Sequence, residues 1–178
     1  VLAEAVLLVG FSIPFWAAEV DAFPKPEDDP FEVRVIAQQF AWNVHYPGAD
    51  GIFGRTSPDL VDEIENPLGL DRDDVNAADD IRGFNMLRIP KGRQVLIHLS
   101  SKDVIHSFGV PEFRIKQDAI PGMRIPIQFT ATMTTDEFKE ASGDEDRNFE
   151  IACAQLCGAT HYSMRGTVRV ESEEEVQA

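Results

Sequence analysis

The sequence predicts an all-β fold, an antiparallel sandwich or barrel, preceded by an apolar N-terminal helix. Three observations support this prediction. Short segments alternate apolar and polar side chains, turn-forming residues separate those segments, and one continuous apolar stretch lies at the N-terminus. At 178 residues, the chain is long enough for one domain with a sizeable core.

The first alternating segment begins at residue 31, where Phe31, Val33 and Val35 alternate with Glu32 and Arg34. The same pattern recurs in the segments 95–99, 125–129, 149–151 and 168–170. Turns that contain Pro and Gly separate the segments. We therefore expect a β domain over residues 31–171.

Residues 1–18 are apolar apart from Glu4 and Ser12. A membrane-spanning helix needs about 20 apolar residues, so we expect residues 1–20 to be the end of a transmembrane helix whose start is missing. A signal-peptide core is the alternative, but no Lys or Arg precedes it and cleavage would have removed it. The flank that follows is acidic, whereas cytoplasmic flanks are rich in Lys and Arg. This flank is predicted to lie on the outer face.

Residues 21–30 contain three prolines and cannot continue the helix, so they form a linker to the β domain. Within that domain, residues 50–80 hold ten acidic residues against two arginines, with few apolar residues. We interpret this segment as a long, solvated surface excursion between two strands, and it lacks the spacing of a calcium loop. Residues 172–178 form an acidic tail.

The net charge is −15, from 16 basic and 31 acidic side chains. This charge makes nucleic acid an unsuitable partner, because phosphates would be repelled. A basic protein partner would instead be attracted at long range. The simpler alternative is that the acidic surface only keeps the protein soluble.

The last thirty residues hold the most informative motif, Cys153-Ala-Gln-Leu-Cys157-Gly-Ala-Thr-His161-Tyr-Ser-Met164, and His106 precedes it by 47 positions. Thiolate and thioether ligands mixed with imidazole favour copper over calcium or magnesium. One Cys with His and Met would indicate a mononuclear blue-copper site. Two Cys four positions apart indicate that each thiolate bridges two metals, which predicts a dinuclear copper centre.

The positions of these residues are consistent with one site. His106 follows the predicted strand 95–99, and the strand 149–152 leads into Cys153, so the ligands meet at one end of the barrel if these strands are neighbours. Gly158 permits the positive φ that a sharply folded loop requires. A loop held between two strands resists changes in metal geometry, which favours electron transfer over substrate turnover. A disulfide between Cys153 and Cys157 is the alternative.

The motif Cys-x-x-x-Cys-Gly-x-x-His-x-x-Met, after an upstream Asp-Val-x-His-Ser-Phe, resembles subunit II of the haem–copper cytochrome c oxidases. That subunit has a cupredoxin-like head, a Greek-key β-barrel or sandwich that carries the dinuclear CuA centre. Three further stretches fit the family pattern: Gln39-Phe-Ala-Trp42, Ile89-Pro-Lys-Gly92-Arg and Lys116-Gln-Asp118-Ala-Ile-Pro121-Gly122-Met. The resemblance covers about residues 31–171 and the end of the second membrane helix.

The resemblance implies a set of copper ligands. In it the two cysteines bridge two coppers, each histidine binds one copper, the methionine is a weak ligand, and a backbone carbonyl is the sixth ligand. In this sequence these residues are Cys153, Cys157, His106, His161, Met164 and, through its carbonyl, Gln155.

The sequence departs from the family at two positions. Many members have Glu where this chain has Gln155, and that carboxylate helps hold magnesium; its loss makes a magnesium site doubtful. The family often has Trp, as the point where electrons enter, where this chain has Phe40, with Trp42 two positions later. Phe40 and Trp42 are therefore candidates for the electron route, or they simply pack. His45 and His98 are expected at the surface.

The resemblance implies an electron relay. A donor, cytochrome c or another small redox protein, would reduce the dinuclear copper, and the electron would pass to a haem in subunit I, where O2 is reduced to water. The chain would be an oxidase subunit with no haem and no oxygen chemistry of its own. Its partners would be subunits I and III and membrane lipid, in the bacterial inner (plasma) membrane with the copper domain on the periplasmic face. No Cys-x-x-Cys-His motif appears before Ala178, so a separate donor is expected unless the chain is truncated.

Three other classes of copper protein are alternatives that share some of these residues. The copper domain of nitrous oxide reductase has nearly the same motif, but typically carries Trp at the position of Gln155 and lacks a membrane anchor. A copper metallochaperone with a thioredoxin fold has its cysteines before its histidine, the reverse of the order found here. A mononuclear cupredoxin with one spare Cys would bind one copper per chain instead of two.

Overall fold

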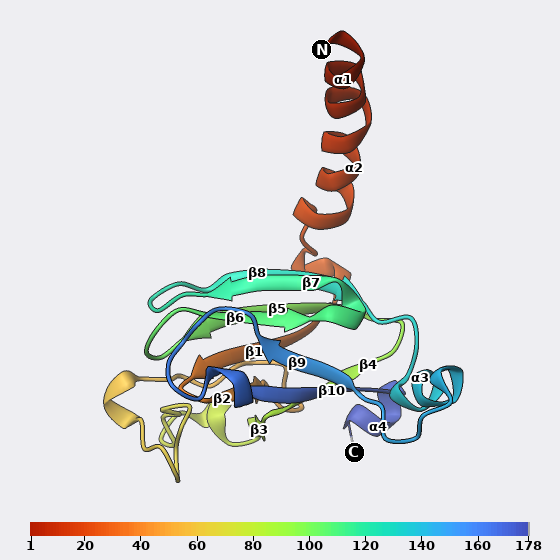
Figure 1. Cartoon of the computed structure of the whole chain (residues 1–178). Helices are drawn as coiled ribbons and strands as arrows, with labels where there is room; N and C mark the ends of the chain where they lie inside the picture. The colour runs from red at the N-terminus through yellow and green to blue at the C-terminus, as the bar shows by residue number, and fades with distance from the viewer. Residues whose placement is uncertain (178) are drawn as a thin grey trace. The chain divides into compact units, whose positions relative to one another are not determined.

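The computed structural model describes residues 1–177, which form two compact units divided between Pro30 and Phe31. In the first unit, residues Leu2–Asp21 form a continuous helix whose length and composition make it a candidate membrane span. It contains α1 (Leu2–Leu7) and α2 (Ile13–Trp16), each followed by a π-helical turn (Figure 1). The predicted apolar N-terminal helix is present.

The described part of the second unit contains ten strands in two five-stranded sheets (Figure 1). The first sheet has the order β3-β2-β1-β5-β8, with bounds Ile81–Phe84, Ala41–Tyr46, Phe31–Gln38, Gln94–Ser101 and Ile125–Thr130. The second has the order β4-β10-β9-β6-β7, with bounds Met86–Pro90, Arg165–Glu171, Phe149–Cys153, His106–Val110 and Ile115–Ala119. Only the pairs β1–β5 and β4–β10 are parallel among the described strands. The prediction of an all-β, cupredoxin-like fold is confirmed.

One hydrophobic core lies between the two sheets. Val33 and Val35 of β1 and Ile97 of β5 face it from the first sheet, and Ile151 of β9 and Val168 of β10 face it from the second. All five side chains are almost fully buried. The two-residue alternation thus marks the inward face of strands such as β1 and β10, as expected for sheets that bury one side.

The outer face of the first sheet is also covered, by part of the connection between β2 and β3. The ring of Phe53 lies 5.2 Å from that of His45, and the Arg34 guanidinium stacks on Phe53 at 4.0 Å. His45 is fully buried and its Nε2 lies 2.6 Å from Asp80. The expectation that His45 is a surface residue is therefore wrong, because residues 50–80 pack against the sheet instead of forming only a solvated loop.

A helix and several short turns complete the second unit. Helix α3 (Thr135–Ser142) begins with a capping box between Thr134 and Glu137 and ends at Gly143 in the left-handed conformation. The short helix α4 (Glu173–Gln177) lies in the tail, of which Ala178 is outside the described residues. Single 3₁₀ turns occur in this unit at Pro58–Leu60, Val75–Ala77, Pro111–Phe113 and His161–Ser163, and one in the first unit at Pro26–Asp28.

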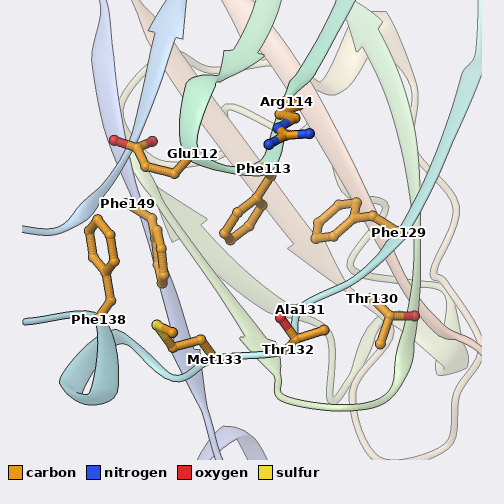
Figure 2. A pocket seen from close by; sticks show the side chains of 10 residues that line it. All are labelled: Glu112, Phe113, Arg114, Phe129, Thr130, Ala131, Thr132, Met133, Phe138 and Phe149. Atoms are coloured by element: carbon orange, nitrogen blue, oxygen red, sulfur yellow. The ribbon is translucent and has the colours of Figure 1, made fainter. Parts of the chain in front are cut away.

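An aromatic cluster surrounds a cavity of about 430 Å³ near the start of β9. Figure 2 shows Phe138 of α3 stacked on Phe149, with Phe113 between Phe149 and Phe129. The rings of Phe138 and Phe149 are 4.3 Å apart. This cavity lies at the end of β9 opposite Cys153, so it is separate from the cysteine motif.

Replacement of a core residue should destabilise the domain far more than replacement of the same residue type at the surface. We expect Ile151→Ala to lower the free energy of unfolding by about 2–5 kcal/mol, because it leaves a cavity in the core. The matched control is Ile81→Ala in β3, where Ile81 is 57% exposed; it should change stability by less than about 0.5 kcal/mol. Denaturant unfolding monitored by circular dichroism measures both, and equal losses would contradict the assigned core.

Candidate metal centre

Two neighbouring strands of the second sheet bring the motif residues together. His106 opens β6 and Cys153 ends β9, and the two strands pair with Phe108 opposite Cys153. The strand 95–99 belongs to the other sheet. The expected meeting of the ligands at one end of the barrel therefore occurs, but β6, which sequence patterning missed, is the strand that provides it.

The two cysteine sulfurs lie at the centre of the cluster. They are 3.7 Å apart and both thiols are free, so the alternative of a disulfide does not apply to this structure. His106 Nδ1 lies 3.9 Å from Cys153 Sγ, and His161 Nδ1 lies 3.5 Å from Cys157 Sγ. One imidazole nitrogen thus lies beside each sulfur.

Two further donor atoms complete the cluster. The Sδ of Met164 lies 3.8 Å from Cys157 Sγ, and the carbonyl oxygen of Gln155 lies 3.2 Å from Cys153 Sγ. Met164 is almost fully buried, whereas Gln155 is exposed and contributes its main chain. The structure therefore brings together all six residues that the sequence predicted as ligands. The ligand atoms of His106, Cys153 and Cys157 lie within 4.8 Å of one another.

Asp103 orients His106, a role that the sequence reasoning did not assign. Its Oδ1 lies 2.8 Å from His106 Nε2, which leaves Nδ1 directed to the sulfurs. Asp103 also accepts a hydrogen bond from the backbone N–H of Gln39. Partial burial raises the pKa of Asp103, but the hydrogen bonds from His106 and from two backbone N–H groups outweigh it and hold the pKa below its usual value. The carboxylate thus fixes the imidazole tautomer, as partners of ligating histidines commonly do.

Gln39 also supports the loop that carries the cysteines. Its Nε2 donates a 2.5 Å hydrogen bond to the carbonyl of Cys157. The next residue, Gly158, has φ of +142°, and a Cβ there would lie 2.8 Å from Gln39 Nε2 and 2.9 Å from the Phe40 ring. Gly158 is therefore required both for its backbone conformation and for the close approach of Gln39 and Phe40.

Burial also affects the protonation of the cluster. Desolvation raises the pKa of the Cys157 thiol to about 11, and its interaction with Cys153 adds to the increase. Because the thiolate is the form that binds metal, Cys157 must release a proton when a metal is bound.

The two aromatic candidates occupy different environments. Trp42 is fully buried, with its ring edge-on to His106 at 6.3 Å and to Phe108 at 5.5 Å. Phe40 is half-buried and lies against Gly158. Because Trp42 has no exposed surface, only Phe40 of the two is accessible to a docked partner.

The donor set suits a soft or borderline metal. Two thiol sulfurs, one thioether sulfur, two imidazole nitrogens and one backbone carbonyl oxygen converge in a largely buried position. None of these six ligand atoms is a carboxylate oxygen. Sites for calcium and magnesium are built from oxygen ligands instead. The chemistry of this cluster therefore fits copper.

Comparison with known proteins places this site in a family. Residues 31–171 match the family described as cytochrome c oxidase subunit II, periplasmic domain. The chain belongs to this family. The alternative cytochrome c oxidase subunit 2 of Bradyrhizobium diazoefficiens is 39% identical over 151 residues, which cover 84% of this chain and 50% of the relative. The cytochrome c oxidase subunit 2 of Cereibacter sphaeroides is 30% identical over 182 aligned residues, covering 95% and 53%.

The chain thus spans about half the length of these curated relatives. A solved structure supports the fold: the crystal structure of the periplasmic domain of cytochrome oxidase subunit II of Bradyrhizobium japonicum has a TM-score of 0.53 and 25% sequence identity. The match covers 82% of this chain and 86% of that chain. Because the chain belongs to the subunit II family, it is not assigned to the nitrous oxide reductases. The all-β fold is incompatible with the alternative of a copper chaperone with a thioredoxin fold.

Loss of the Asp103 carboxylate should weaken metal binding in this subunit II domain. We expect Asp103→Asn to lower metal affinity about 10- to 100-fold, because the amide no longer holds His106 in one tautomer. The matched control is Asp59→Asn, at an exposed position of the β2–β3 connection. Competition with a copper chelator measures the affinity, and an unchanged value for Asp103→Asn would contradict the orienting role.

Proposed function

We propose that this chain is the electron-accepting part of a haem–copper terminal oxidase and that it binds a dinuclear copper centre. The observation that carries this proposal is the position of four further ligand atoms around two free sulfurs 3.7 Å apart. One imidazole beside each sulfur fits two metals better than one. When bound, a pair of coppers that shares two thiolates supplies a carrier for one electron.

The residues have distinct roles in this proposal. Cys153 and Cys157 would bridge the coppers, His106 and His161 would each bind one, and Met164 would be a weak ligand. The carbonyl of Gln155 would complete the set. The Gln155 side chain is an uncharged amide, so this position offers magnesium no carboxylate.

Backbone hydrogen bonds hold the metal-binding loop in place. The N–H of Cys153 donates to the Met164 carbonyl at 3.2 Å, and the N–H of Ala154 donates to the Ser107 carbonyl at 2.9 Å. The N–H of His161 donates to Gly158 within the loop at 3.2 Å. These bonds oppose rearrangement of the ligands, and small rearrangement favours rapid electron transfer over bond-making chemistry.

Exposed apolar side chains flank the cluster and provide a surface for a protein partner. Leu156 and Tyr162, which adjoin the ligands in sequence, are each 79% exposed, and Ile105 before His106 is 45% exposed. A partner docked on these side chains would lie close to the ligands. Phe40 borders the same loop, so it is our candidate for the residue through which electrons enter, with Trp42 buried behind His106.

The electron donor in this proposal is cytochrome c or another small redox protein, drawn by the net charge of −15. The electron would pass to a haem in subunit I, where oxygen is reduced to water, and subunit III would complete the complex. The helix Leu2–Asp21 would anchor the chain in the bacterial inner membrane, with residues 31–171 as the copper domain on the periplasmic face. Residues 21–30 would serve as the linker, residues 50–80 as the acidic excursion and residues 172–178 as the tail.

Copper counting and electron paramagnetic resonance test the dinuclear centre. We expect two coppers per chain and a hyperfine pattern from two equivalent copper nuclei in the detergent-solubilised chain. Cys157→Ser should leave at most one copper, because a shared thiolate is lost. Met164→Leu serves as the comparison: it should keep both coppers and shift the reduction potential, since a weak ligand tunes the site without holding it.

One copper per wild-type chain would support the mononuclear alternative and contradict this proposal. A Cys157→Ser variant with the wild-type spectrum would contradict the bridging role specifically.

Stopped-flow reduction of the copper-loaded chain by cytochrome c tests the docking surface. Leu156→Ala should lower the second-order rate constant about fivefold, because an apolar contact of about 1 kcal/mol is lost. The control Leu60→Ala, in the β2–β3 connection, should leave the rate unchanged; Leu60 is 45% exposed. The wild-type rate should fall as ionic strength rises. Equal rates for the two variants would show that docking occurs elsewhere.

A further inference from the structure

A row of basic side chains crosses the outer face of the first sheet, away from the metal centre. Arg34 of β1 lies opposite His45 of β2 and, on its other side, opposite His98 of β5. His98 in turn lies opposite Pro126 of β8, and Arg124 comes two residues before Pro126. Directly opposed residues share one face of a sheet, so these side chains gather on the face that the β2–β3 connection covers.

A small cavity of about 90 Å³ lies at this row. Its lining residues are Arg34, Ile36, His45, Thr56, Leu68, His98, Ser100 and Arg124. Within the described chain, the lining includes four basic side chains, two hydroxyl groups and no carboxylate. The volume is about that of three water molecules, so the cavity admits a small ion and excludes a nucleotide.

Two carboxylates near the cavity each lie within hydrogen-bond distance of one of its two histidines. Asp80 lies 2.6 Å from His45 Nε2, and Glu32 lies 3.0 Å from His98 Nε2. Neither Arg34 nor Arg124 has a carboxylate within ion-pairing distance among residues 1–177. Burial and the neighbouring charge of Arg124 lower the pKa of the Arg34 guanidinium, and the charges of Asp80 and Glu32 partly oppose this decrease. This arrangement is unusual in a chain of net charge −15.

Buried polar atoms at the cavity lack partners. The Nε of Arg34 and the Nδ1 of His45 are both buried without a hydrogen bond, as is the Oδ1 of Asp80 beside His45, and His45 is fully buried. Unsatisfied buried groups indicate a water or ion that completes them. The Arg34 guanidinium offers N–H donors. When His45 donates a hydrogen bond from Nε2–H to the Asp80 carboxylate, its Nδ1 is an acceptor. Burial lowers the pKa of His45, against the hydrogen bond to Asp80, so the ring is neutral at pH 7.

We propose that this basic cavity, formed by Arg34, His45, His98 and Arg124, binds a protonated oxyanion of the phosphate class. The two guanidinium groups would bind the anionic oxygens, as arginine commonly does with phosphate. The Nδ1 of the neutral His45 ring would accept a hydrogen bond from the P–OH group. Sulfate has the same shape but no proton at neutral pH, so it would leave His45 unsatisfied, and the cavity should discriminate against it.

Phosphorus NMR of the detergent-solubilised, copper-loaded chain, titrated with inorganic phosphate at constant ionic strength, tests this site. We expect saturable binding that sulfate displaces at least about tenfold less effectively than phosphate itself. Arg124→Gln should weaken binding about tenfold or more; Arg124 is exposed, so folding should be unaffected. Lys116→Gln on β7 of the other sheet is the matched control and should bind as wild type.

Each outcome of this experiment bears on the proposal. Unsaturable binding, or equal affinities of the Arg124→Gln and Lys116→Gln variants, would overturn the site. Equal competition by sulfate would overturn the assigned role of His45. Glycerol 3-phosphate distinguishes the source: competition at the affinity of phosphate supports a lipid headgroup as the ligand, and absence of competition supports a free anion. An unchanged copper spectrum on phosphate addition separates this site from the metal centre.

Discussion

The pairing of β6 with β9 is the contact on which the metal centre depends. It holds the start of one strand, His106, beside the end of another, Cys153, so that a residue 47 positions away reaches the motif. The loop that follows then bends back toward β10, and Gly158 allows Cys157 to approach the sulfur of Cys153, with His161 beside the sulfur of Cys157. Without that pairing, the motif would lack its upstream imidazole.

A second layer of contacts limits how far the cluster can change. Asp103 holds His106 from behind, and the Gln39 side chain holds the Cys157 carbonyl. The N–H of Gln39 also donates to Asp103, so the two supports are joined to each other. In the proposed electron relay, this shared framework would keep the ligands in place when an electron arrives or leaves.

The acidic residues 50–80 show that charge composition does not reveal what a carboxylate does. Asp62 accepts hydrogen bonds from two backbone N–H groups, Asp79 from those of Ala49 and Asp50, and Asp80 from Gly54 and buried His45. These side chains shape the connection and fold it over the sheet, where it covers the basic cavity. Part of the negative charge thus serves local structure instead of a docking surface.

The sequence by itself determined the fold class and the apolar helix, and it named the six candidate ligand residues that the structure brings together, because a two-residue alternation and a dense Cys–His–Met motif are local patterns. It did not reveal β6, the strand that carries His106, since β6 is buried on both faces and does not alternate. Nor did it reveal Asp103 and Gln39 as supports, or His45 as buried. Those roles arise from contacts between residues far apart in the chain, and only the packing of the two sheets and the β2–β3 connection decides which of those residues meet.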